Sequence, residues 1–199
     1  MQLRTLAVTL ALAAALALGG CSPASAPKPA TKPRPVPPSA EGSLANPVGN
    51  DAAFVNSLVR SGDRLFETTS LPNLTEARRA FSRTLVPRDT LGRKLVAIVY
   101  EKASAPGVDP RETLKLVYEG RLVVTEQYRA KRIRHPIMEN PTRETTATPG
   151  GSGTVELLGS GTKATALVEW VADVNYYYFV MAPGLTKAEA VRIARSMAP

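Results

Sequence analysis

The chain has 199 residues, of which 44% are hydrophobic and 21% are charged, and its formal net charge is +8. This composition is ordinary for one globular domain with appendages. A single cysteine excludes a disulfide within the chain. With one histidine, no Gly-x-Ser-x-Gly motif and no His/Asp/Glu cluster at metal-ligand spacing, the sequence predicts no cofactor and no metal site, and it argues against an enzyme.

The first 20 residues have the layout of a secretory signal peptide. A short start with one positive residue, Arg4, precedes residues 6–18, which are apolar or small apart from Thr9. A membrane-spanning helix needs about 20 apolar residues, so this shorter run argues against a permanent span. We therefore expect residues 1–20 to be removed.

The apolar run ends in Leu18-Gly19-Gly20-Cys21, which resembles the lipobox of bacterial lipoproteins. The resemblance implies that the thiol of Cys21 receives a diacylglyceryl group and that the bond before Cys21 is cut. The alternative is an ordinary signal peptide with a cysteine nearby. Two or three acyl chains would hold the protein stably in the cell membrane, facing the extracytoplasmic side, either the periplasm or the cell exterior.

Residues 21–50 are predicted to form a disordered, proline-rich linker that carries the lipidated cysteine. Eight of the residues from Ser22 to Asn50 are proline, and the segment lacks the apolar surface needed to order itself. In an extended polyproline conformation it spans up to roughly 90 Å. We interpret it as a spacer, with a proline-rich ligand for a partner domain as the alternative.

Residues 51–199 are predicted to form a single domain, with 21 basic and 16 acidic residues and a net charge near +5. For a lipid-tethered domain outside the cytoplasm, the nearby anions are lipid headgroups and anionic wall polymers. We therefore expect the membrane as a partner through the anchor, an envelope protein or lipid as a second partner, and no nucleic acid.

The periodicity of apolar residues predicts helices at the start of the domain and strands after them. The predicted helices cover 51–61 and 75–81, and the predicted strands cover 93–101, 113–118, 121–128, 154–158, 163–171 and 175–182. Glu119-Gly120 is typical of a tight hairpin turn, and residues 139–153 are predicted to form a loop. Thr186, three residues before Glu189, forms a capping box that opens a C-terminal helix.

The densest basic cluster follows the second strand of the hairpin. Its members are Arg129, Lys131, Arg132 and Arg134. One hypothesis is contact with an anionic surface. The alternative, which we favour, is a solvated edge strand guarded by charge, because a continuing strand would divide the cluster between two faces. His135, directly before Pro136, is predicted to be an exposed loop residue.

Aromatic residues gather on the last two predicted strands. One face carries Trp170, Tyr176, Tyr178 and Val180. These residues could line a cavity for an apolar ligand, or they could pack as a core face beneath the final helix. We favour the core, because large apolar side chains on alternating strand positions are most often buried.

Two parts of the domain carry a resemblance to a known family. They are Leu74-Thr75-Glu76-Ala77, Phe81, Leu85-Val86-Pro87 and Leu91-Gly92-Arg93-Lys94-Leu95 at the start, and Leu167-Val168-Glu169-Trp170, Tyr176-Tyr177-Tyr178, Gly184-Leu185-Thr186-Lys187-Ala188-Glu189-Ala190 and Ile193-Ala194-Arg195-Ser196-Met197 at the end. This order resembles a bacterial extracytoplasmic domain of unknown function, found in Gram-positive lipoproteins and in anti-sigma-factor-like membrane proteins.

The resemblance implies a distant likeness to the outer-membrane lipoprotein carriers and sigma-regulator sensors, in which a curved antiparallel sheet wraps over helices. We therefore predict an α+β fold: a curved antiparallel β-sheet of about six strands, with N-terminal helices and a C-terminal helix packed on it. The family's motifs are structural and name no catalytic group, and fold alone does not establish function.

We expect a non-enzymatic binding or sensing module of the cell envelope, held at the membrane through Cys21. A lipid or lipoprotein carrier with an apolar cavity is one alternative. An assembly role in the envelope is another. The third is an exported hydrolase, for which Glu156 and Glu169, facing one another across adjacent strands, are a candidate carboxylate pair.

Overall fold

The computed structural model describes residues 44–60, 65–103, 105–129 and 143–199. In chain order the helices are α1 (Asn50–Arg60), α2 (Leu74–Ala80) and α3 (Lys187–Arg195). None of the helices in the described ranges is long and apolar enough to cross a membrane.

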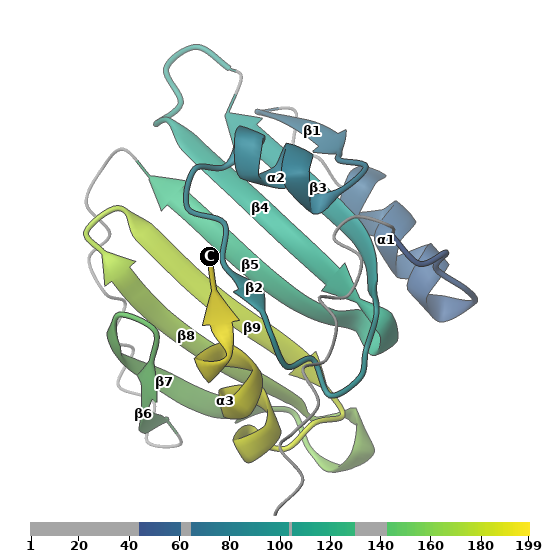
Figure 1. The fold of residues 1–199 in the computed structure, drawn as a ribbon, viewed down its shortest axis with the longest axis vertical. Helices are drawn as coiled ribbons and strands as arrows, with labels where there is room; N and C mark the ends of the chain where they lie inside the picture. Colours follow the sequence, from purple (N-terminus) through teal and green to yellow (C-terminus); the bar gives the residue numbers. More distant parts are fainter. Residues whose placement is uncertain (1–43, 61–64, 104, 130–142) are drawn as a thin grey trace, which may run out of the picture. The chain divides into compact units, whose positions relative to one another are not determined.

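One antiparallel sheet of eight strands dominates the fold (Figure 1). In spatial order its strands are β1 (Phe66–Ser70), β3 (Leu95–Ala103), β4 (Arg111–Tyr118), β5 (Leu122–Arg129), β9 (Tyr176–Pro183), β8 (Thr165–Asp173), β7 (Gly151–Leu158) and β6 (Glu144–Thr148). Two short strands, β2 (Val86–Pro87) and β10 (Met197–Ala198), pair separately. The predicted α+β class with an antiparallel sheet is confirmed, and the sheet is open, with β1 and β6 at its edges.

The prediction of about six strands was wrong, because both edge strands of the large sheet were missed. β1 and β6 have the sequences Phe-Glu-Thr-Thr-Ser and Glu-Thr-Thr-Ala-Thr, in which apolar residues do not alternate. An edge strand is held by backbone hydrogen bonds on one side and tolerates polar side chains. The loop predicted over 139–153 is therefore wrong where β6 and the start of β7 form a hairpin.

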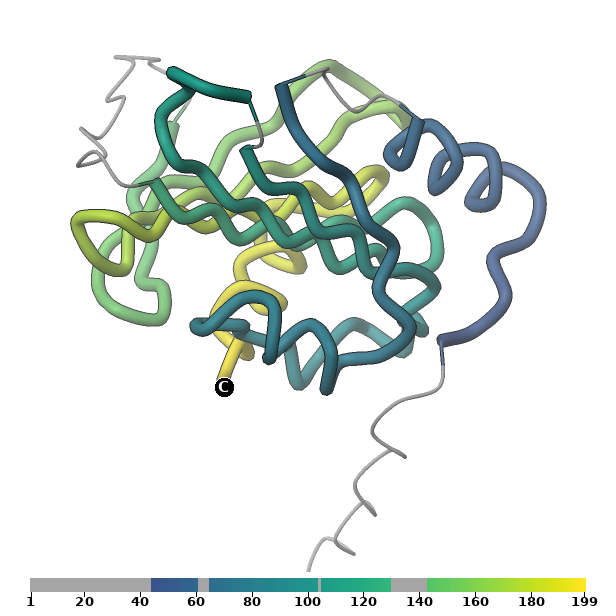
Figure 2. The backbone as a smooth tube through the Cα atoms, turned by 90° about the horizontal axis from the view of Figure 1, so that it is seen from above, coloured from purple at the N-terminus to yellow at the C-terminus, as the bar shows by residue number. Residues whose placement is uncertain are grey.

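The two faces of the sheet differ in what covers them. We call the face that carries Leu116, Val124 and Val180 the core face; α2 and α3 pack on it, and it contains the main apolar cluster. The other side, here the opposite face, has a smaller cluster in which α1 covers the ends of β3, β4 and β5. Viewed from above, α1 and α2 lie on different sides of the sheet (Figure 2).

Local sequence explains where the helices begin and how the central hairpin turns. Thr186 and Glu189 form the predicted capping box: the Glu189 backbone N–H donates to Thr186 Oγ1 at 3.2 Å, and the Thr186 N–H donates to Glu189 Oε2 at 2.9 Å. The turn between β4 and β5 is a short 3-10 helix, η1 (Glu119–Arg121), in which Gly120 has a φ of +69°. Glycine adopts this left-handed conformation without steric cost.

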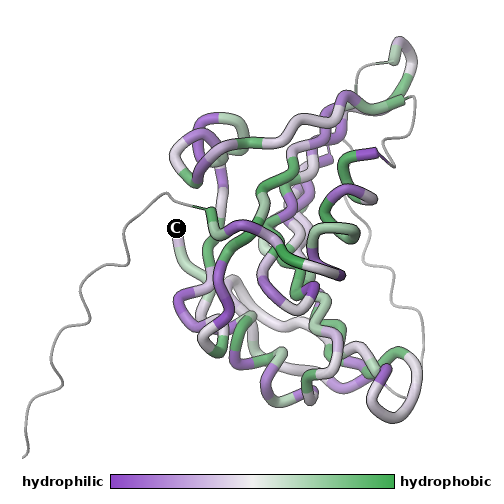
Figure 3. The backbone as a smooth tube through the Cα atoms, turned by 90° about the vertical axis from the view of Figure 1, so that its right-hand side faces the viewer, coloured by the Kyte–Doolittle hydropathy of each residue, from purple (hydrophilic) through white to green (hydrophobic). Residues whose placement is uncertain are grey.

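A strap, residues 82–94, connects α2 to β3 and crosses the core face (Figure 1). It contains β2, whose Val86 and Pro87 pair with Ala198 and Met197 of β10. Hydrophobic and hydrophilic residues are mixed along the backbone of the domain (Figure 3). The strap's Leu85, Val86 and Leu91 are partly buried against the main apolar cluster, so the strap closes the core face between α2 and α3.

Candidate functional site

The aromatic residues of β8 and β9 lie in the main apolar cluster of the core face. Trp170 and Val180 are fully buried and Tyr178 is 2% exposed. The Trp170 and Tyr178 rings stack with centroids 5.4 Å apart and planes 12° from parallel. Tyr176, half-buried, meets Phe81 edge-on at 6.0 Å. All four predicted residues contact other protein groups, as in a packed core.

Glu126 of β5 is the one fully buried acidic side chain in the described residues, and it points into the core face between apolar neighbours. The backbone N–H of Leu85, in the strap, donates to Glu126 Oε1 at 2.9 Å and to Oε2 at 3.1 Å. Burial raises the pKa of this carboxyl well above its ordinary value, although the Leu85 hydrogen bond lowers it in part. Burial therefore favours the protonated form of Glu126, and its carboxyl holds the strap to the sheet.

Two polar atoms of the core face have no hydrogen-bond partner among the residues that the structure describes. They are the Tyr118 hydroxyl and the Trp170 indole N–H, both shielded from solvent. Burial, and after it the nearby Glu126 carboxyl, raises the pKa of Tyr118. An unsatisfied buried donor costs stability, so these two atoms mark where the hydrogen bonding of the core face is incomplete.

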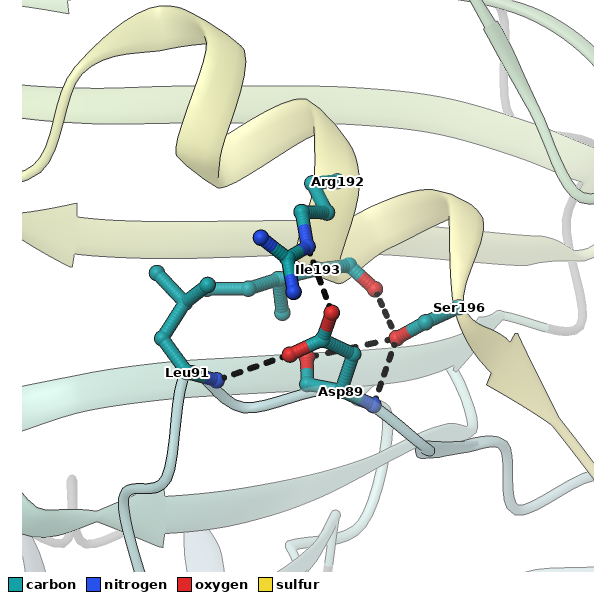
Figure 4. Close-up of polar contacts among 5 residues, drawn as sticks. All are labelled: Asp89, Leu91, Arg192, Ile193 and Ser196. Carbon is teal, nitrogen blue, oxygen red and sulfur yellow. Dashed lines mark hydrogen bonds and ion pairs between the residues drawn. The ribbon is translucent and has the colours of Figure 1, made fainter. Parts of the chain in front are cut away.

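The strap's second half is held by a polar cluster at the C-terminal end of α3 (Figure 4). Arg192 Nε donates to Asp89 Oδ2 at 2.5 Å, and the Asp89 N–H donates to Ser196 Oγ at 3.1 Å. The Leu91 N–H donates to Asp89 Oδ1, and this bond is the largest of the effects that lower the pKa of Asp89. These contacts organise the backbone of the strap and do not resemble a catalytic group.

On the opposite face, two glutamates share one arginine. Arg143 Nη2 lies 2.7 Å from Glu156 Oε1, and Arg143 Nη1 lies 3.4 Å from Glu169 Oε2. Glu156 is only 3% exposed, and it lies diagonally across from Glu169 because its partner in the β7–β8 register is Leu167. The prediction that the two carboxylates face one another was therefore wrong. An arginine bridges them, as in a structural ion-pair network rather than an acid/base pair.

The same face carries Arg129, the first residue of the predicted basic cluster. Arg129 ends β5, which lies between β4 and β9, so the expectation that the cluster's strand is a sheet edge was wrong for this residue. Directly opposite Arg129 in the β4–β5 register is Arg111, which was not predicted as a site residue. Lys131, Arg132, Arg134, His135 and Cys21 lie outside the described residues.

No protein-family model, curated protein or solved structure matches this chain in the comparisons made. Within the described ranges, no three His, Cys, Asp or Glu side chains lie together where they could hold a metal ion. The candidate functional site is therefore defined by geometry alone: the charged side chains of the opposite face, with Arg111 and Arg129 at one end of it.

Proposed function

We propose that the protein is a membrane-anchored extracytoplasmic lipoprotein whose domain is a non-enzymatic binding or sensing module of the cell envelope. The sequence Leu18-Gly19-Gly20-Cys21 supports lipidation at Cys21, and the proline-rich residues 22–50 support a spacer between the membrane and the domain. The membrane is then the first partner, and an envelope protein or lipid is the second.

The observation that carries the binding role is the difference between the two faces of the sheet. On the core face, Trp170, Tyr178 and Val180 are buried against protein, and the strap and two helices close over them. On the opposite face, ionisable side chains lie along neighbouring strands, and Arg129 is exposed. A partner would therefore meet the charged side chains of the opposite face.

A lipid or lipoprotein carrier is the second candidate, and one observation favours it. The Tyr118 hydroxyl and the Trp170 N–H lie unpaired in the core face beneath the strap, among the described residues. A ligand that entered there would have to displace the strap, whose Leu85 N–H donates to Glu126. The two candidates differ in where the ligand binds, so they can be separated.

The anchor is tested by the intact mass and detergent partition of the full chain expressed in a bacterium that processes lipoproteins. We expect the wild-type protein to begin at Cys21, to carry lipid mass on that residue and to enter the detergent phase. The Cys21→Ser variant should carry no lipid, whereas the neighbouring Ser22→Ala control should behave as wild type. Lipid on the Cys21→Ser chain would disprove anchoring at Cys21.

The two candidate activities are separated by extracting the purified protein with organic solvent. Mass spectrometry then identifies and quantifies any non-covalently bound lipid in the extract. About one lipid per chain, lost on substitution of Trp170 by a smaller residue and kept on substitution of Arg129, would indicate a carrier. Absence of stoichiometric lipid, together with a partner captured by cross-linking through the opposite face, would indicate a binding module.

A further inference from the structure

The chain that leads from Cys21 enters the folded domain at one end of the large sheet. The backbone N–H of Ala45 donates to the carbonyl of Leu95 at 2.9 Å. Leu95 begins β3 and lies opposite Tyr118, the last residue of β4 before the turn η1. The domain therefore begins beside η1.

A second short turn, η2 (Gly161–Lys163), lies at the same end of the sheet, between β7 and β8. Both β5 and β8 pair antiparallel with β9, so they run in the same direction and begin at the same end. The turn η1 precedes β5 and η2 precedes β8, whereas β7 and β9 finish there. We call this the linker end; it consists of residues 44–49, η1, η2 and the ends of the strands beside them, including 157–158 of β7 and 181–183 of β9.

Exposed apolar side chains gather at the linker end. The described residues include six large hydrophobic side chains that are exposed, and four of the six lie there: Val48, Leu157, Leu158 and Met181. Val48, two residues before α1, is 76% exposed. The other two, Leu65 and Val174, lie at the far end of the sheet, where β1 begins and β8 ends. Apolar residues that gather on one part of a surface, with polar groups around them, mark a contact with a protein or a membrane.

Positive side chains lie among these apolar residues. Arg121 of η1 and Lys163 of η2 are exposed, and neither forms an ion pair with another described residue. The two carboxylates beside η1, those of Asp51 and Glu119, each accept from a backbone N–H, at 2.9 and 3.1 Å. The linker end therefore presents unpaired positive charge together with apolar side chains, which is the composition of surfaces that bind anionic membranes.

We propose that the linker end is the surface by which the domain binds an anionic phospholipid bilayer. In this orientation the exposed apolar side chains enter the headgroup region, and Arg121 and Lys163 contact lipid phosphates. Two cations and a few apolar side chains bind a bilayer weakly by themselves, but a tether to the same bilayer raises their effective concentration. The chain that carries the tether enters at this end, which favours a bilayer over a protein as the occupant. Because the tether is the lipid on Cys21, the proposal rests on the proposed function.

The first experiment compares how closely the two ends of the domain approach the bilayer. The lipidated chain is placed in vesicles of phosphatidylcholine and phosphatidylglycerol. Cys21 is the only cysteine and its thiol is acylated, so the Leu158→Cys chain takes a fluorescent label at one position. Val174→Cys is the matched control, because Val174 is 47% exposed, against 42% for Leu158, and lies at the far end. We expect lipids brominated on their acyl chains to quench the label of the Leu158→Cys chain about threefold more strongly, because quenching requires contact with the acyl region.

The second experiment tests the two cations. Arg121→Gln and Lys163→Gln together should lower the quenching in the Leu158→Cys chain by about half, since they remove the contacts with lipid phosphates. Arg60→Gln and Lys102→Gln remove the same charge at the far ends of α1 and β3 and should leave the quenching unchanged. Thermal midpoints show whether both double variants fold.

The outcomes separate this proposal from the anchor. Equal quenching of the two labels, or equal effects of the two double variants, in a chain whose intact mass shows lipid on Cys21 would overturn the proposal and leave the anchor standing. A mass without lipid would overturn the proposed function and this proposal with it.

Discussion

The two faces of the sheet deal with ionisable residues in opposite ways. Among the described residues, the core face contains one buried acid, Glu126, whose pKa is raised by burial and whose two oxygens accept from a backbone N–H. The opposite face pairs some of its ionisable groups with one another, as Arg143 pairs with Glu156 and Glu169. Burial beneath a strap disfavours the charged form of an acid, whereas an ion pair offsets part of the cost of burying charge.

The largest expected effect is a loss of packing on the core face. Leu116→Ala, at a fully buried position, should lower the free energy of unfolding by about 2–5 kcal/mol through lost burial and a cavity. Leu158→Ala, on the opposite face and 42% exposed, should cost less than about 1 kcal/mol. Chemical denaturation of both variants measures the difference. Equal losses would mean that the opposite face is packed as tightly as the core face.

The second prediction concerns the raised pKa of Glu126. Its pKa is raised in the folded protein, so above about pH 4.5 the unfolded chain releases a proton that the folded chain retains. The free energy of unfolding should then fall as pH rises toward the folded pKa, by up to about 1.4 kcal/mol per pH unit.

Glu126→Gln removes this proton and keeps an oxygen that can accept from the Leu85 N–H. We expect the variant to be more stable than wild type at pH 7, with a smaller dependence on pH between about 4.5 and 7. Urea unfolding at several pH values measures it. Glu112→Gln serves as the control. Glu112 also lies on the core face, at the more exposed end of β4. An unchanged pH profile in Glu126→Gln would mean that Glu126 is ionised in the fold.

The third prediction tests the ion-pair network of the opposite face. Arg143→Met should lower the free energy of unfolding by about 1–3 kcal/mol, since it leaves the buried Glu156 and the partly exposed Glu169 without this partner. Glu156→Gln in the Arg143→Met background should recover part of the loss, because one buried charge is removed. A double-mutant cycle measures the coupling between the two residues, and a coupling near zero would contradict the network.

The smallest expected effect is the loss of the cap on α3, which closes the core face. Thr186→Ala removes the side chain that accepts from the Glu189 N–H, and it should cost about 1 kcal/mol. Thr186→Ser keeps the hydroxyl and should cost only a fraction of that. Thermal unfolding compares the two, and similar losses would indicate that the methyl group, rather than the cap, is responsible.

The parts of the fold that depend on local sequence were predictable. The alternation of apolar and polar residues predicted the hairpin of β4 and β5. The spacing of Thr186 and Glu189 predicted the start of α3. The pairing of β5 with β9 was not predictable, since it joins segments far apart in the chain and no local pattern encodes it. The polar edge strands β1 and β6 were missed because their stability comes from backbone pairing.

More residues of the candidate site could have been predicted from the sequence. Arg111 was missed because the predicted strand began at Thr113, two residues too late. Had it begun at Arg111, the turn at Glu119-Gly120 would have set Arg111 opposite Arg129 by register alone. Glu126 could also be recognised, since the alternation of β5 places it on the same face as Leu122 and Val124. The burial that raises its pKa, by contrast, depends on packing between segments far apart in the chain, which sequence periodicity does not position.

The pairing of β2 with β10 has a consequence for the order in which the domain is completed. A chain that is synthesised from its N-terminus produces the strap early, but Val86 and Pro87 find their partners only when Met197 and Ala198 emerge. Until then the strap, whose Arg83 carbonyl accepts from the Tyr178 hydroxyl, is not held by β10 over the core face, and exposed apolar surfaces are prone to aggregate. Pairing with β10 therefore holds the strap over the core face. A chain that ended before β10 would lack this pairing and would leave part of the core face exposed.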